Sequence, residues 1–202
     1  MTVIKQDDLI QSVADALQFI SYYHPVDFIQ AMHEAYLREE SPAARDSMAQ
    51  ILINSRMCAT GHRPICQDTG IVTVFVRVGM DVRWDGATMG LDDMINEGVR
   101  RAYNLPENVL RASILADPAG ARRNTKDNTP AVIHYSIVPG NTVEVDVAAK
   151  GGGSENKSKW PCSTRPTRSL TGCSRPFRPW ARAGAHRACW VSASAAPRKK
   201  PQ

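Results

Sequence analysis

A short segment of the chain gathers side chains that could do chemistry. Residues 64–70 read PICQDTG and place a thiol, a carboxamide, a carboxylate and a hydroxyl in succession at Cys66, Gln67, Asp68 and Thr69. A loop between a helix and a strand is where a rigid scaffold usually presents functional groups, and the final glycine lets the backbone turn tightly. Residue types alone still favour a simpler interpretation, a buried loop cysteine beside a capping aspartate.

Two further segments could hold an anion. Residues 150–157 read KGGGSENK, and successive glycines leave backbone N–H groups free to approach a carboxylate or a phosphate while lysines add positive charge. The spacing is not that of a phosphate-binding P-loop, and a plain flexible loop is an equal alternative. Arg111 lies among apolar neighbours, where a guanidinium could clamp a carboxylate. Taken alone, Arg111 is better interpreted as a surface arginine covering a helix end.

The other polar candidates favour structural roles. Cys58 lies near a predicted helix end and is most simply a small buried hydrophobe. The turn before Pro130 carries side chains that more often cap backbone groups than bind ligands: Asn124, Thr125, Asn128 and Thr129. The histidines share no metal-ligand spacing, and the three cysteines after residue 160 match no zinc signature.

Helices lead the elements that must position these groups. Apolar residues at helical spacing follow two aspartates over 7–22, which predicts an amphipathic helix. Start signals at Pro25 and at Ser41–Pro42 predict two more helices, so the N-terminal quarter is expected to form a small helical bundle. A further helix fits residues 91–103.

Three strands are predicted between residues 71 and 148. Alternating valines predict a strand over 71–78 with one apolar face, and residues 131–138 and 142–148 predict a hairpin joined by Pro139-Gly140-Asn141. The expected fold is therefore α+β, with the helical bundle packed against a small mixed or antiparallel sheet.

Composition divides the chain near residue 160. The 202 residues carry a net charge of +5, but residues 161–202 hold nine basic and no acidic residues, which leaves residues 1–160 acidic overall. The tail also holds six prolines and only one leucine, with no isoleucine, methionine or tyrosine, so we expect it to be disordered. No apolar run is long enough to span a membrane, and the start lacks the pattern of a secretory signal, which predicts a cytoplasmic protein.

The ICQDTG motif of residues 65–70 and the KGGGSENK motif of residues 150–157 together closely resemble class I fumarate hydratases. This iron–sulfur hydro-lyase family includes tartrate dehydratases, and the similarity runs from about residue 5 to Lys159. The resemblance implies a 4Fe–4S cluster held by three cysteines, an open iron that binds substrate, a C4 dicarboxylate such as fumarate or malate, a tricarboxylic acid cycle reaction and a homodimer.

The resemblance also implies roles for individual residues. Cys66 matches the first cluster ligand, and Gln67 and Asp68 match residues that reach the substrate, with Asp68 near the hydroxyl that leaves or enters. Arg111 matches an arginine that grips a substrate carboxylate, and Gly152 matches a glycine whose backbone lies against the substrate. Asp68 is the expected catalytic residue, and the base for the carbon-bound proton lies in the family's C-terminal half.

The chain departs from the family after Trp160, where a second cluster cysteine within a GAGWCPPG motif is expected. If codons for the tail are read one base later, they can spell both the family continuation and this motif. The match is constrained at several points, because tryptophan has a single codon. We therefore infer a one-base frameshift near codon 160, with residues 1–160 forming the N-terminal part of the catalytic domain and 161–202 an out-of-frame tail. With one of three ligands, the chain is expected to hold no intact cluster and to be inactive.

Two alternatives remain. A tartrate dehydratase alpha-type subunit would use the same residues, since both substrates are C4 dicarboxylates. From a different class, the basic tail could bind nucleic acid, although its aromatic residues follow no recognisable stacking module. We expect no nucleic-acid or membrane partner.

Overall fold

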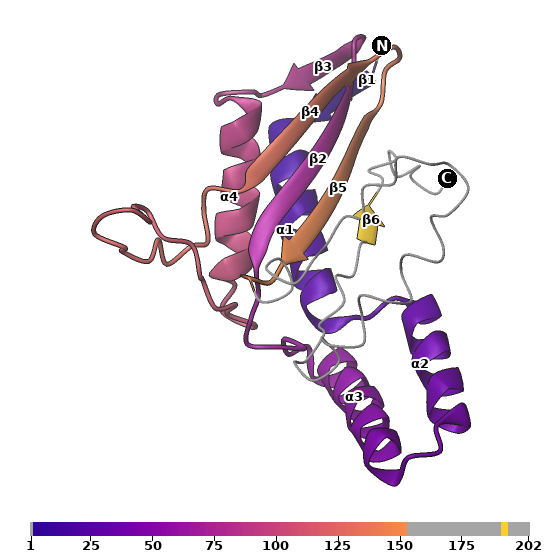
Figure 1. The fold of residues 1–202 in the computed structure, drawn as a ribbon. Helices are drawn as coiled ribbons and strands as arrows, with labels where there is room; N and C mark the ends of the chain where they lie inside the picture. Colours follow the sequence, from indigo (N-terminus) through magenta and orange to yellow (C-terminus); the bar gives the residue numbers. More distant parts are fainter. Residues whose placement is uncertain (1, 153–190, 194–202) are drawn as a thin grey trace, which may run out of the picture.

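The computed structural model describes residues 2–152 and the backbone of residues 191–193 (Figure 1). The elements run in the order β1 (Thr2–Lys5), α1 (Gln6–Tyr22), α2 (Val26–Arg38), α3 (Pro42–Gly61), β2 (Ile71–Gly79), β3 (Val82–Asp85), α4 (Leu91–Tyr103), β4 (Val132–Val138), β5 (Val143–Lys150) and β6 (Val191–Ala193). Helices and strands share one core, which confirms the predicted α+β class.

The core lies between a pair of helices and one face of the sheet. Helix α1 buries the apolar stripe predicted from its spacing, and α4 lies beside it against the same sheet face (Figure 1). The alternating valines of β2 and β5 fill the other side of this core: Val72, Val74, Val76, Val143, Val145 and Val147. At about 25 cal/mol per Å² of apolar surface removed from water, this layer is the main source of stability.

The two helices of this layer approach closely at a glycine. A Cβ added to Gly98 of α4 would lie 2.7 Å from the carbonyl oxygen of Ile10 and 2.8 Å from the Cβ of Val13. Such contacts are too short for any larger residue, so Gly98 sets the separation of α1 and α4.

The predicted hairpin between 131–138 and 142–148 is wrong. The strand order is β4-β2-β5-β6, so β2 lies between β4 and β5, parallel to β4 and antiparallel to β5. The tight turn at 139–141 exists, but it crosses over the end of β2 instead of joining two paired strands (Figure 1).

A glycine at the end of β2 permits this crossing. A Cβ on Gly79 would collide with the backbone of Gly140, and the Gly79 N–H donates to the carbonyl oxygen of Thr142 at 2.8 Å. The Asp81 N–H likewise donates to the Gly140 oxygen at 2.9 Å. The turn is therefore hydrogen-bonded at the end of β2, and it leaves one edge of β2 to pair with β4 and the other with β5.

The three leading helices divide into two groups. Helices α2 and α3 pack on each other as a hairpin that projects beyond the sheet, whereas α1 belongs to the main core (Figure 1). Apolar residues of this hairpin are exposed, including Leu37 and Met57, and α2 buries no residue completely. A short parallel pair, β1–β3, covers the opposite end of the core.

Most of the predicted tail, residues 161–202, lies outside the described residues. Its exception is β6, which pairs antiparallel with β5 although this part of the sequence carries no strand pattern. The edge of β5 offers free backbone groups, so pairing there needs no particular side-chain pattern. None of the described helices is both long and apolar enough to cross a membrane.

Replacing Gly98 by alanine should destabilise the domain. The added methyl group must push α1 away from α4, which costs about 1–3 kcal/mol for overpacking in a dense core. Gly61→Ala is the matched control, because its Cβ would meet only the side chain of Arg63, at 3.8 Å. Urea unfolding of both variants measures the difference, and equal stabilities would contradict the close packing.

Candidate functional site

Residues 64–70, called here the Cys66 loop, begin beside two helices, α1 and α3. The Ile65 N–H donates to the Ser21 oxygen of α1 at 2.8 Å, and the Asn54 side chain of α3 donates to the Ile65 oxygen at 3.2 Å. Cys58 of α3 is buried, as predicted, and its Sγ lies 3.6 Å from the Pro64 oxygen. The start of the loop is thus fixed by the last turn of α1 and by the second half of α3.

Buried side chains hold the other end of the loop. The Tyr103 hydroxyl, at the end of α4, donates to the Thr69 oxygen at 3.0 Å. The Asn128 side chain donates to the Gly70 oxygen at 3.0 Å, and Gly70 itself adopts a φ of +77°, which favours glycine. The Thr69 hydroxyl donates to the Arg111 backbone oxygen. Two successive carbonyl groups are therefore directed inward.

Inward carbonyls leave the reactive part of the loop near solvent. Cys66 is half-buried, while Gln67 and Asp68 are exposed. The Cys66 Sγ lies 3.6 Å from the Gln67 carboxamide oxygen, and the Asp68 N–H points at the sulfur from 3.5 Å. The interpretation of Cys66 as a buried loop cysteine is therefore wrong, because the residue is only half-buried and its Sγ contacts polar groups of Gln67 and Asp68.

The start of the glycine-rich segment packs directly on the Cys66 loop. A Cβ on Gly70 would lie 2.5 Å from the Lys150 carbonyl carbon, and a Cβ on Gly151 would lie 2.7 Å from the Asp68 carboxylate. Glycine at these positions allows backbone and carboxylate to approach. Gly152 follows and is exposed, with open space where a side chain would be. Residues 153–157 of the motif lie outside the described residues.

Arg111 joins the site through its backbone. It follows α4 in a segment without regular secondary structure, not at a helix end, and it is exposed. Its carbonyl oxygen accepts from Thr69, so Arg111 and the Cys66 loop are neighbours although the sequence separates them by about forty residues. The structure thus places Cys66, Asp68, Arg111 and Gly151 in one region.

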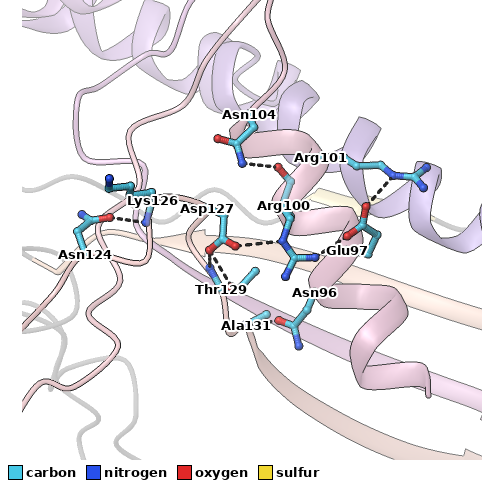
Figure 2. Close-up of polar contacts among 10 residues, drawn as sticks. All are labelled: Asn96, Glu97, Arg100, Arg101, Asn104, Asn124, Lys126, Asp127, Thr129 and Ala131. Carbon is cyan, nitrogen blue, oxygen red and sulfur yellow. Dashed lines mark hydrogen bonds and ion pairs between the residues drawn. The ribbon is translucent and has the colours of Figure 1, made fainter. Parts of the chain in front are cut away.

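The chain between Arg111 and β4 is held by polar contacts with α4 (Figure 2). Arg100 donates to the Asp127 carboxylate at 3.1 Å, and that carboxylate also accepts from the Thr129 N–H and hydroxyl. The Asn96 side chain accepts from the Ala131 N–H at 2.9 Å. These contacts fix the residues on both sides of Asn128, as expected for a turn with structural capping.

Two residues of this arrangement were missed as functional candidates. Tyr103 was included only as the last residue of a predicted helix, and Asn128 only as part of a capping turn. No pattern near either residue indicates a partner thirty to sixty positions away, so only a structure could find them.

Residues 2–152 contain few side chains that could bind a metal cluster. No group of three or more histidine, cysteine, aspartate or glutamate side chains there could hold a metal ion. The second described cysteine, Cys58, is buried with its Sγ near the Asn54 carboxamide. The described part of the chain therefore offers one accessible thiol, Cys66, which does not make a complete cluster site.

Comparison with known proteins gives the family. The family described as Fumarate hydratase (Fumerase) matches residues 10–189, which is most of the chain. The chain belongs to this family. The resemblance predicted from the two motifs is confirmed, and the match extends past Lys159, where the resemblance was expected to end.

Individual relatives include both kinds of enzyme named in the family. "Fumarate hydratase class I, anaerobic" of Escherichia coli is 35% identical over 109 residues, 54% of this chain and 19% of that protein. "Fumarate hydratase 2" of Leishmania major is 35% identical over 124 residues, 59% and 21% of the two chains. "L(+)-tartrate dehydratase subunit alpha" of Escherichia coli is 27% identical over 146 residues, 72% and 47%.

The chain spans about half the length of the tartrate dehydratase subunits that it matches. It spans about a fifth of the length of the fumarate hydratases. The activity of those longer proteins is therefore not assigned to this chain by similarity alone.

Removing the Tyr103 hydroxyl should change how stability depends on pH. Burial, with a smaller effect of the Asp68 charge, raises the pKa of Tyr103 to about 12 from the ordinary 10.0. Because the pKa of Tyr103 is higher in the folded than in the unfolded chain, its contribution to the free energy of unfolding is complete below pH 10. As the pH rises towards 12, this contribution, about 3 kcal/mol, is lost. Tyr103→Phe should reduce this alkaline loss and cost about 1 kcal/mol at neutral pH.

Urea unfolding between pH 8 and 12 measures both effects. Tyr36→Phe, on α2, is the control and should leave the pH profile unchanged. An alkaline loss as large in Tyr103→Phe as in the unmodified chain would contradict the role of Tyr103.

Proposed function

We propose that this chain carries the N-terminal part of a hydro-lyase site that adds water to fumarate to form L-malate, and removes it again. The observation that supports this most is the packing of the Cys66 loop against Arg111 and Gly151, far apart in sequence. The segments that carry the Cys66 thiol, the Asp68 carboxylate and the Arg111 backbone are therefore neighbours, and the exposed Gly152 follows directly. A C4 dicarboxylate needs such a combination, since it presents two anionic ends and a hydroxyl or a double bond between them.

Each residue has a distinct task in this proposal. The Arg111 guanidinium binds one substrate carboxylate with two parallel hydrogen bonds, a geometry that lysine cannot reproduce. The Gln67 carboxamide and the exposed backbone at Gly152 complete the binding of the diacid. Asp68 lies next to this space and, as the catalytic residue, accepts a hydrogen bond from the hydroxyl that enters or leaves. Neutralising the carboxylate beside the reacting carbon also makes its proton more acidic.

We further propose that Cys66 is one thiolate ligand of a 4Fe–4S cluster, the cofactor of class I fumarate hydratases. Its half-buried sulfur among polar groups is accessible to a metal. The described residues do not supply a complete set of thiolates, so the tasks proposed for this chain are those of its own side chains and backbone. The second cluster cysteine of the family's GAGWCPPG motif is not in the sequence after Trp160, and this is the reason to expect that the chain alone is inactive.

A tartrate dehydratase subunit is the alternative function. The E. coli relative named for that activity is matched over 47% of its own length, against 19–27% for the fumarate hydratases. Tartrate carries one more hydroxyl than malate, which a second polar group beside Asp68 could bind. The domain boundary near residue 160, a homodimer and a cytoplasmic location stay predictions.

Binding of the diacid to the 202-residue chain tests the site directly. Arg111→Ala should weaken binding of fumarate and L-malate by about ten- to a hundredfold, because a hydrogen-bonded charge pair with the substrate is lost. Arg123→Ala is the control, an exposed arginine in the same segment. Isothermal titration calorimetry measures the affinities of both variants for fumarate and L-malate, and D-tartrate and L-tartrate are titrated as alternative ligands. Equal losses in the two variants, or no binding by the unmodified chain, would contradict the proposal.

Anaerobic reconstitution with iron and sulfide tests the cofactor assignment. The unmodified chain should show no stable cluster absorbance and no hydration of fumarate, since the family's GAGWCPPG cysteine motif is not in its sequence. A full-length fumarate hydratase treated in parallel shows that the procedure works. Iron-dependent fumarate turnover by the 202-residue chain, abolished in Cys66→Ser, would show that the chain is a complete enzyme and that the expected inactivity is wrong.

A further inference from the structure

We propose that Asn128 is a positioning residue that fixes the Cys66 loop relative to residues 111–113, called here the Arg111 segment. This inference rests on the proposed function, because these two segments carry Asp68 and Arg111. Asn128 touches no space where the substrate would bind and acts only through its neighbours.

The Asn128 side chain bridges the two segments with both of its polar atoms. Its Nδ2 donates to the Gly70 oxygen at 3.0 Å, and its Oδ1 accepts from the Ser113 N–H at 2.8 Å. Asn128 is completely buried, and both bonds join it to backbone groups. A buried bond of this kind is costly to break because the backbone group loses its partner without gaining water.

The backbone of Asn128 is also arranged for this task. Its φ of 61° lies in the left-handed region, which asparagine tolerates better than most residues. The neighbouring Asp127 and Thr129 are bonded to each other, and Asp127 is bonded to Arg100 of α4 (Figure 2). The bridge is therefore anchored on α4, the helix that packs in the core.

The other anchors of the site lack this double connection. Tyr103 contacts the Cys66 loop through its hydroxyl. The Asn124 side chain donates to the Ala112 oxygen of the Arg111 segment at 2.8 Å and accepts from the Lys126 N–H, without contacting the loop. The Thr69 hydroxyl of the loop also reaches the Arg111 segment directly, by donating to the Arg111 oxygen. Asn128 differs because it lies outside both segments and is hydrogen-bonded to each of them, so it helps to set the spacing between the backbones that carry Asp68 and Arg111.

Two substitutions test the two hydrogen bonds of Asn128: one removes both bonds, and the other removes only the bond to Gly70. Asn128→Gly keeps the left-handed conformation and removes both bonds. Asn128→Asp keeps the acceptor for the Ser113 N–H but, when ionised, cannot donate to Gly70. Asn124→Ala is the matched control, because it removes an asparagine that holds the Arg111 segment alone.

Amide hydrogen exchange of the 202-residue chain, without any ligand, is the test. In Asn128→Gly, the amides of Ser113 and of Asp68 should both exchange about tenfold faster. In Asn128→Asp, the Asp68 amide should still exchange about tenfold faster while Ser113 stays within about threefold of the unmodified chain. In Asn124→Ala, the Asp68 amide should not change.

The opposite results are equally clear. Unchanged exchange at Asp68 in both Asn128 variants would overturn the proposal. Equal acceleration in the amides of α4 would show that Asn128 only stabilises the whole domain, which would also overturn it.

Titration with fumarate then separates this inference from the proposed function. Both Asn128 variants should bind fumarate about tenfold more weakly than the unmodified chain, at temperatures where all variants are folded. Loss of protection at Asp68 without any fumarate binding by the unmodified chain would count against the proposed function and leave the positioning role intact. Full fumarate affinity in variants that have lost protection at Asp68 would refute the positioning role itself.

Discussion

The structure depends on the burial of Val72, Val74 and Val76, on one face of β2, beneath the helices α1 and α4. These side chains are almost completely removed from water, and Gly98 allows the two helices that cover them to approach closely. Since β2 begins directly after Gly70, its position fixes where the Cys66 loop ends. Hydrophobic burial, a force without direction, thus determines the place of a loop whose own residues bury little.

Directional hydrogen bonds then give this loop its conformation. Successive carbonyl groups at Thr69 and Gly70 are held by Tyr103 and Asn128, from two different parts of the chain. The inward carbonyls leave Cys66, Gln67 and Asp68 facing outward. A site on a loop is usually less rigid than one on a helix or strand, and buried donors of this kind compensate for that.

Membership in the fumarate hydratase family agrees with this arrangement, and the chain matches only part of each relative. The described residues contain a half-buried thiol, an exposed carboxylate and an arginine in one region, but no complete set of metal ligands. The exposed apolar residues of the α2–α3 hairpin show in addition that this hairpin buries little of its surface against the described core.

The sequence by itself determined the family, the four helices and the strands β2, β4 and β5, with most of their boundaries within a residue or two. No pattern in it indicated β1, β3 or β6. Helical spacing in α1, the valines of β2 and the motifs around Cys66 and Gly151 are local patterns, which short-range physics and residue types make readable. Only the tertiary structure decided that β4 and β5 lie on opposite edges of β2. It also decided that Cys66 is accessible and that Asn128 joins the Cys66 loop to the Arg111 segment. Strand partners and buried bridges depend on which distant backbone groups meet in the core, and no local pattern encodes that meeting.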